Sequence, residues 1–303
     1  MMFGRRWMTS CYLVEADEPA LVETAPTTSL QAVIDGLRAL GIGAGDLAHI
    51  VVTHIHLDHA GGAGTLAPHF PGATVWVHER GAPHLADPAR LVASAARIYG
   101  EGRLEELFGP VDPVPSERLR AVSDGDRIAL GDRHLDVLYT PGHASHHVAL
   151  FDSSTDVVFV GDALGVFLPD VQVLRPATPP PEFDLELAIH SIELIRDRQP
   201  PAILFSHFGP AEEVTDLCEL AISRLRRWMD VVQEALTHSA ELSEVVRRLR
   251  RGTADEIRAV STERLEENEE RYELLSSYEM NAMGLIRYLE RGQDSAARRS
   301  ATS

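Results

Sequence analysis

Four residues of the types that bind metal ions fall within six positions of this chain, in the run Thr53-His54-Ile55-His56-Leu57-Asp58-His59. The run follows the apolar stretch 49–52, which is typical of a buried strand. A strand that ends in this pattern places three imidazoles and a carboxylate in one small volume. Histidines that close together have few uses other than holding a metal ion. The run therefore predicts a metal site, and it favours a fold that gathers further ligands around it.

The composition narrows the classes of partner. The 303 residues are enough for one large α/β domain, or for a core of about 200 residues with an appendage. The net charge is −18, and all 28 basic residues are arginine. An acidic chain binds nucleic acid poorly, and a chain without lysine has neither Schiff-base chemistry nor a P-loop lysine. We expect a small-molecule substrate and no nucleic-acid partner.

The cysteine content and the lack of long apolar segments favour a cytoplasmic location. The two cysteines, Cys11 and Cys218, are too few and too far apart for a disulfide framework, which fits a reducing environment. The start of the chain has no apolar run of signal-peptide length, and no segment reaches the roughly 18–20 apolar residues that span a bilayer. We therefore expect a cytoplasmic protein without membrane insertion.

The periodicity changes along the chain. Up to position 210, short apolar runs alternate with helical patterns, and nine strands are predicted at 11–15, 20–24, 49–53, 73–78, 127–130, 135–139, 148–151, 157–160 and 202–205. No convincing strand follows His207, and helical spacing dominates over 214–236, 243–250 and 264–289. We predict an α/β domain at 1–210, an α-helical region at 211–292 and a small, polar, disordered tail at 293–303.

Three later strands also end in residues of metal-binding types. His143 follows the strand 135–139 through the turn Pro141-Gly142, Asp162 follows 157–160, and His207 follows 202–205. Functional sites of α/β folds lie where strand ends meet at one edge of a sheet. The candidate ligands, in chain order, are therefore His54, His56, Asp58, His59, His143, Asp162 and His207.

This ordered set resembles the motifs of the metallo-β-lactamase superfamily: H-x-H-x-D-H, then a His, an Asp and a final His. The resemblance implies an α/β fold of the four-layer αββα sandwich type, here with a C-terminal helical appendage, and a site with two metal ions. By the family pattern, one ion takes His54, His56 and His143. The second takes Asp58, His59 and His207, and Asp162 bridges both. Asp58 is assigned as catalytic as well as ligating, and a hydroxide shared by the ions is the expected nucleophile.

Two further assignments rest on the same resemblance. His146, three residues after His143, resembles a second histidine often found in this region of the superfamily. It is a candidate for a residue that contacts the ligands and orients them without binding the metal itself. The two divalent ions are expected to be zinc, with iron and manganese as alternatives, because sites of His and Asp accept all three.

The branch of the superfamily leaves several functions open. The full ligand set and the helical C-terminus resemble glyoxalase II-like thioesterases. The segments 143–146, 180–184, 206–210 and 281–289 resemble a prokaryotic group of generic hydrolases of this fold. The leading expectation is a dinuclear hydrolase that attacks an ester, thioester or lactone carbonyl. One alternative is a mononuclear iron oxygenase like the persulfide dioxygenases, which would use His54, His143 and Asp162. Another is a non-catalytic metal-binding scaffold, with the helical region as a partner or homodimer surface.

Overall fold

A computed structural model describes residues 2–301 apart from 4, 6, 169 and 259–264. Its contacts divide the chain into two compact units. The first unit comprises residues 1–139, 146–161 and 200–212, and the second comprises 140–145, 162–199 and 213–303. The sequence predicts a single boundary at 210, but the chain changes units several times. Residues 140–145 and 162–199 belong to the second unit, whereas 146–161 and 200–212 belong to the first. The domain boundary at 210 stays a prediction.

The first sheet of the first unit is mostly parallel. Its strands lie in the order β1 to β5: Tyr12–Val14, Ala20–Val22, His49–Val51, Thr74–His78 and Leu119–Val122. β1 and β2 form an antiparallel hairpin, and β2 to β5 run parallel. Every residue of β3 is buried, as its continuous apolar run predicts. The run 53–59, which contains the first four candidate ligands, therefore begins at the carboxyl end of a central strand.

The second sheet of the first unit is mostly antiparallel. Its order is β13-β12-β9-β8-β7-β6, with strands Gly209–Ala211, Ile203–Phe205, Val158–Gly161, Val148–Asp152, His134–Tyr139 and Arg127–Ala129. Only β9 and β12 pair in parallel. His207 leaves β12 and the segment of His146 leads into β8. Both histidines thus lie next to strands of this sheet.

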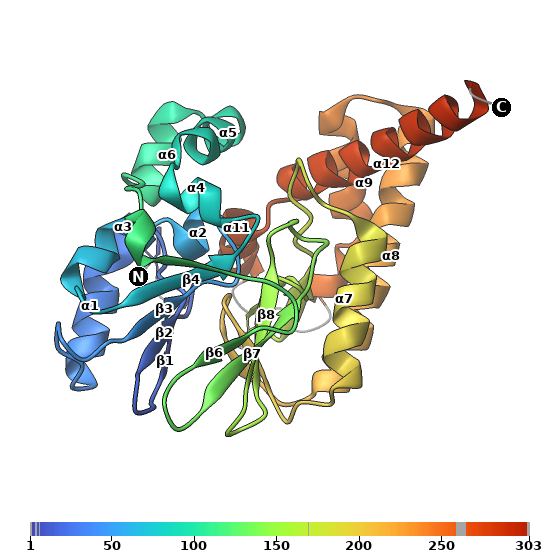
Figure 1. Cartoon of the computed structure of the whole chain (residues 1–303). Coiled ribbons are helices and arrows are strands. Elements are labelled where there is room, and N and C mark those ends of the chain that lie inside the picture. The colour runs from blue at the N-terminus through green and yellow to red at the C-terminus, as the bar shows by residue number, and fades with distance from the viewer. Residues whose placement is uncertain (1, 4, 6, 169, 259–264, 302–303) are drawn as a thin grey trace. The chain divides into compact units, whose positions relative to one another are not determined.

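Apolar side chains of the two sheets pack on each other. The shared cluster includes Val22 and Val51 from the first sheet and Leu135, Leu150 and Phe159 from the second. A second cluster joins the other face of the first sheet to α1 (Leu30–Ala39), whose Leu30, Ile34 and Leu37 are buried. Figure 1 shows α1 alongside β1 to β4. The first unit is therefore layered as helix, sheet and sheet.

Five helices lie between β3 and β5 in the chain. They are α2 (Leu57–Ala60), α3 (Ala63–Leu66), α4 (Ala82–Ala86), α5 (Ala89–Tyr99) and α6 (Glu101–Phe108). Short 3₁₀ turns lie at Thr27–Ser29, Ala67–His69 and Ser116–Arg118. The last three, α4 to α6, follow one another closely but are separate helices. Pro88 precedes α5, and Gly100, which has a φ of +79°, separates α5 from α6.

The second unit is mainly helical. It contains the hairpin β10 (Val166–Leu168) and β11 (Val173–Arg175), and helices α7 to α12: Leu185–Asp197, Val214–His238, Leu242–Gly252, Asp255–Arg258, Leu265–Leu275 and Tyr278–Ala301. α8, α9 and α12 pack on one another (Figure 1). The predicted C-terminal helical region is confirmed. No helix of the described residues is long and apolar enough to cross a membrane.

Three local predictions differ from the structure. A strand, β13, does follow His207; its Pro210 disfavours a strand in general but is tolerated at a sheet edge. The helix predicted over 264–289 is interrupted, because the hydroxyl of Ser277 accepts a hydrogen bond from the N–H of Met280 and so caps a new helix. The backbone is helical to Ala301, within the predicted tail, because Ala and Arg favour helices. Residues 302 and 303 lie outside the described part.

We predict that the contact between the sheets dominates the stability of the first unit. Leu150→Ala, at a fully buried position, should lower the free energy of unfolding by about 2–5 kcal/mol. Leu40→Ala, at a side chain that is 63% exposed, is the matched control and should change it by less than about 0.5 kcal/mol. Urea unfolding followed by circular dichroism measures both. Equal effects would contradict the proposed role of this core.

Candidate metal centre

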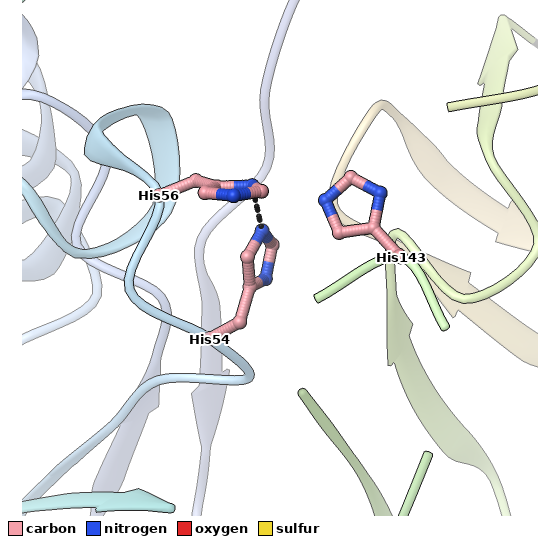
Figure 2. A group of neighbouring side chains, drawn as sticks. All are labelled: His54, His56 and His143. Atoms are coloured by element: carbon pink, nitrogen blue, oxygen red, sulfur yellow. Dashed lines mark hydrogen bonds between the residues drawn. The ribbon is translucent and has the colours of Figure 1, made fainter. Parts of the chain in front are cut away.

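His54 and His56 converge where β3 ends. The Nε2 atom of His54 lies 3.0 Å from the Nδ1 atom of His56, and Figure 2 shows this hydrogen bond between the two rings. Nδ1 of His54 lies 3.0 Å from the hydroxyl of Thr53. Nitrogen ligands of a tetrahedral zinc ion lie about 3.3 Å apart, given Zn–N bonds of about 2.0–2.1 Å. The spacing of the two rings therefore suits shared coordination.

A second group forms within the first unit from Asp58, His59 and His207. The first two belong to α2, and His207 follows β12. Oδ2 of Asp58 lies 3.3 Å from Nε2 of His207 and 3.8 Å from Nε2 of His59. One ligand atom of each residue lies within 4.8 Å of the others. The fold thus brings together, from distant parts of the sequence, three side chains that can hold one ion.

Hydrogen bonds fix the rings of this second group. Nδ1 of His207 donates to the backbone oxygen of Met8 over 2.8 Å, and Nδ1 of His59 lies 3.1 Å from a carboxylate oxygen of Glu23. A carbonyl or carboxylate oxygen can only accept, so the proton of each neutral ring is on Nδ1. Nε2 then carries the lone pair that a metal requires. Both rings are completely buried, so solvent does not compete for their orientation.

Glu23 is a component of the site that the sequence analysis missed. Its carboxylate is 1% exposed, and it accepts hydrogen bonds from the hydroxyl of Thr53 (2.6 Å), the hydroxyl of Ser206 (2.9 Å) and the N–H of Thr53 (3.3 Å). With His59, four donors surround one carboxylate. Together with His54 and His59 it also forms a group close enough to hold an ion. The signal was available: Glu23 is an acidic residue directly after the buried strand β2.

The second unit carries His143 and Asp162, the remaining two candidates. Nε2 of His143 lies 3.6 Å from Oδ2 of Asp162, and both side chains are buried. Nδ1 of His143 donates to the backbone oxygen of Ala177 over 2.9 Å. The same reasoning places the proton of this ring on Nδ1 and its lone pair on Nε2. His143, which is drawn in Figure 2, thus shares with His59 and His207 an Nδ1 atom that faces an oxygen able only to accept.

The turn before His143 is held by α7. Gly142 has a φ of +131°, and a β-carbon at this position would collide with the backbone nitrogen of Ala188. The hydroxyl of Ser191 donates to the oxygen of Pro141 over 2.6 Å, and the N–H of Asp184 donates to the oxygen of Gly142 over 2.8 Å. The glycine predicted to allow this turn is therefore required both by its backbone angle and by its close contact with the helix.

His146 lies among the histidines of the first unit. Its Nδ1 accepts a hydrogen bond of 3.4 Å from the N–H of Ile55, and its ring stacks parallel to that of His54 with centroids 6.1 Å apart. It also meets the ring of His56 edge to face at 5.6 Å. This geometry suits a residue that supports the ligands, but a role of His146 in metal binding stays a prediction.

An apolar cluster lies behind α2. Tyr99 packs edge to face on Phe108 with centroids 5.2 Å apart, in a group that includes Leu57 and Leu104. Burial raises the pKa of Tyr99 well above its ordinary value, and the charge of Asp58 raises it further. Tyr99 is therefore a neutral phenol near Asp58. The cluster packs against Leu57 of α2, the short helix that carries Asp58 and His59.

The donor set fits divalent metal ions. The candidate atoms are neutral imidazole nitrogens and carboxylate oxygens, which suit zinc as well as iron and manganese. Where a hydrogen-bond partner can only accept, as for His59, His143 and His207, the ring nitrogen on the other side carries the lone pair. Orientation of ligands by such outer contacts is a general property of metal sites. These histidines, which the sequence predicts as ligands, therefore have a nitrogen lone pair available for a metal ion.

The comparisons with known proteins agree with this chemistry. A model of the metallo-beta-lactamase superfamily matches residues 4–207, and the chain belongs to that superfamily. The structure of the metallo-beta-lactamase family protein TTHA1429 from Thermus thermophilus superposes with a TM-score of 0.67 at 22% identity, over 97% of this chain and 92% of that one. The predicted fold class is confirmed.

Two curated relatives are similar in sequence. The chain is 28% identical over 212 residues to the uncharacterized protein YobT of Bacillus subtilis (strain 168), covering 68% of this chain and 85% of YobT. It is 33% identical over 164 residues to the acyl-coenzyme A thioesterase MBLAC2 of Gallus gallus, covering 50% of this chain and 56% of that protein. The second alignment spans only about half the length of the relative.

We predict that Glu23 supports both folding and metal binding. Glu23→Ala leaves the buried donors of Thr53, Ser206 and His59 without their acceptor, so it should lower the free energy of unfolding by about 3–5 kcal/mol. Loss of the contact that orients His59 should weaken Zn²⁺ binding by about 10–100-fold. Urea unfolding and Zn²⁺ titration against a competing chelator measure the two effects.

Glu18→Ala is the matched control for this prediction. Glu18 also contacts a histidine, His49, at 3.2 Å, but its side chain is 57% exposed. Its removal should cost about 1 kcal/mol or less and leave Zn²⁺ affinity unchanged. Wild-type Zn²⁺ affinity in Glu23→Ala would contradict the role that we assign to Glu23.

Proposed function

We propose that this chain is a dinuclear metal-dependent hydrolase that acts on an ester, thioester or lactone carbonyl. The observation that carries the proposal is the presence of two distinct ligand groups from one short motif. His54 and His56 converge on one point, while Asp58 and His59 join His207 in another. A protein that uses a single ion has no need of the second group.

The remaining ligands are assigned from the order of the family motifs. His143 is proposed to complete the group of His54 and His56, and Asp162 is proposed to serve both ions. The pairing of His143 with Asp162 at 3.6 Å and the lone pair on Nε2 of His143 support the assignment. Zinc is proposed as the metal because histidine nitrogens dominate the donor set.

The histidines and Asp58 have different proposed roles in the reaction. Two divalent ions in such a site lower the pKa of bound water and polarise the carbonyl oxygen of the substrate. His59, His143 and His207 can hold a proton on Nδ1 and would bind an ion through Nε2, so as ligands they would be neutral imidazoles that preserve the positive charge of the centre. The Asp58 side chain is 22% exposed, whereas His59 and His207 are fully buried. Asp58 is thus the member of its group that contacts solvent, and we propose that its carboxylate orients the attacking water.

The substrate class rests on two kinds of similarity. MBLAC2 is an acyl-coenzyme A thioesterase, and the full ligand set with a helical C-terminus resembles glyoxalase II-like enzymes. Both observations favour a thioester over the other carbonyl substrates. The site itself, with water as the nucleophile, serves esters and lactones equally well.

Metal content and hydrolysis together test the proposal. Protein reconstituted with Zn²⁺ should hold about two ions per chain and hydrolyse model thioesters, esters or lactones. Asp58→Ala should retain about one ion and lose about 100-fold or more in kcat/KM, because it removes a ligand and a charged group. His69→Ala, which changes an exposed histidine outside the motif, should match the wild type in both. Elemental analysis and steady-state assays measure these quantities.

Other outcomes identify the alternatives. About one iron ion per chain with oxygen consumption in the presence of glutathione persulfide would favour the mononuclear oxygenase. Two ions without hydrolysis of any of the three substrate classes would favour the metal-binding scaffold. Either result would overturn the proposed hydrolase.

A further inference from the structure

The segment that follows β11 is held by the start of α12, within the second unit. The hydroxyl of Ser276 donates to the oxygen of Pro176 over 2.5 Å. Oδ1 of Asn281 accepts from both the N–H (2.7 Å) and the hydroxyl (2.8 Å) of Thr178. All of these side chains are buried: Asn281 is 1% exposed, and Thr178 is 0% exposed. Pro176 and Thr178, two positions apart in one short segment, are therefore bound to the start of the same helix.

The amide of Asn281 is fixed from both sides. Its Nδ2 donates to the hydroxyl of Ser276 over 2.7 Å and to the oxygen of Ser277 over 2.8 Å. The N–H of Thr178 can only donate, so the amide atom that faces it must be the oxygen. Asn281 thus uses both ends of its side chain to join the segment at Thr178 to the turn between α11 and α12.

The residue enclosed by these bonds orients a candidate ligand. Ala177 lies between Pro176 and Thr178, and its backbone oxygen accepts the hydrogen bond from Nδ1 of His143 over 2.9 Å. The position of this oxygen sets the direction in which the imidazole points. Asn281 is linked to His143 through one short stretch of backbone, although 138 positions separate the two residues in the sequence (281 − 143 = 138).

Two other residues secure the same contact. The guanidinium of Arg175 lies over the rings of Tyr278 (4.3 Å) and Tyr272 (4.9 Å), and its Nη1 donates to the oxygen of Ser276 over 3.1 Å. A β-carbon at Gly284 would collide with the oxygen of Thr178, so α12 approaches this backbone directly. The side chains of Thr178, Ser276 and Asn281 are buried on both sides of this contact, and they leave little freedom for the carbonyl of Ala177.

We propose that Asn281 is a positioning residue for His143, and that the C-terminal helices thereby determine how one of the two metal ions is bound. The inference rests on the proposed function, in that His143 is taken as a metal ligand. It assigns the helical region a task within the metal centre. The simpler alternative is that Asn281 contributes only to the stability of the fold.

Two measurements distinguish these roles. In Asn281→Ala, Zn²⁺ titration should show one ion bound about 10–100-fold more weakly and the other unchanged. In metal-free protein, the imidazole NMR signal of the His143 Nδ1 proton should broaden or shift, because its acceptor is no longer fixed. A residue with a purely structural role would lower the melting temperature but leave the His143 signal and the ratio of the two affinities unaltered.

Asn268→Ala is the matched control. Asn268 is the only other asparagine in the chain and is buried in α11, within the same helical region. Its replacement should leave the His143 signal and both affinities as in the wild type. If Asn281→Ala does not fold, Thr178→Val takes its place. It removes only the two bonds of the hydroxyl, to Oδ1 (2.8 Å) and to the backbone oxygen (3.2 Å) of Asn281, and nearly preserves volume. The same changes are expected, in smaller size.

The failure of this inference is separable from that of the proposed function. A wild-type protein that binds fewer than two ions would refute the dinuclear centre, whereas the His143 signal would still report on positioning. A wild-type protein with two ions, and an Asn281→Ala variant with unchanged affinities and an unchanged His143 signal, would overturn the inference alone.

Discussion

The first unit depends on one buried carboxylate. Glu23 ends β2 and accepts hydrogen bonds from Thr53 at the end of β3, from Ser206 at the end of β12 and from His59 on α2. A buried charge is tolerated only when its hydrogen-bonding capacity is used, because its loss of hydration costs several kcal/mol. The ends of β3 and β12, which His54 and His207 follow, therefore meet around this carboxylate. The same group joins the two sheets and orients one ligand, which links folding to the candidate site.

A common principle governs the ligand rings. His59, His143 and His207 each direct Nδ1 to an oxygen that can only accept: a carboxylate for His59 and backbone carbonyls for the other two. The tautomer and the direction of each ring are thus decided before any ion binds. The ordering cost of the ligands is met by folding, so metal binding has less entropy to overcome. We therefore expect the contacts that surround the candidate ligands to affect metal affinity.

The sequence anticipated much of the architecture, for identifiable reasons. Buried strands such as β3 and β8 are continuous apolar runs, and α7 and α8 show strong helical spacing. The predictions that differed concern short or interrupted elements. β13 contains a proline, and the helices on either side of Ser277 form one continuous pattern in the sequence. Such boundaries depend on single hydrogen bonds, which periodicity does not reveal.

The chemistry of the candidate centre can be read from the sequence alone, because histidine and aspartate residues follow successive strands in a distinctive order. What holds those residues in place is visible only in the folded chain. Glu23 could have been one more polar residue after a strand, and Asn281 an ordinary position on a helix. Their importance comes from partners far away in the sequence, Ser206 for Glu23 and Thr178 for Asn281. Hydrogen bonds to distant residues, and to backbone carbonyls above all, carry no pattern of residue types, so they are decided only when the chain is folded.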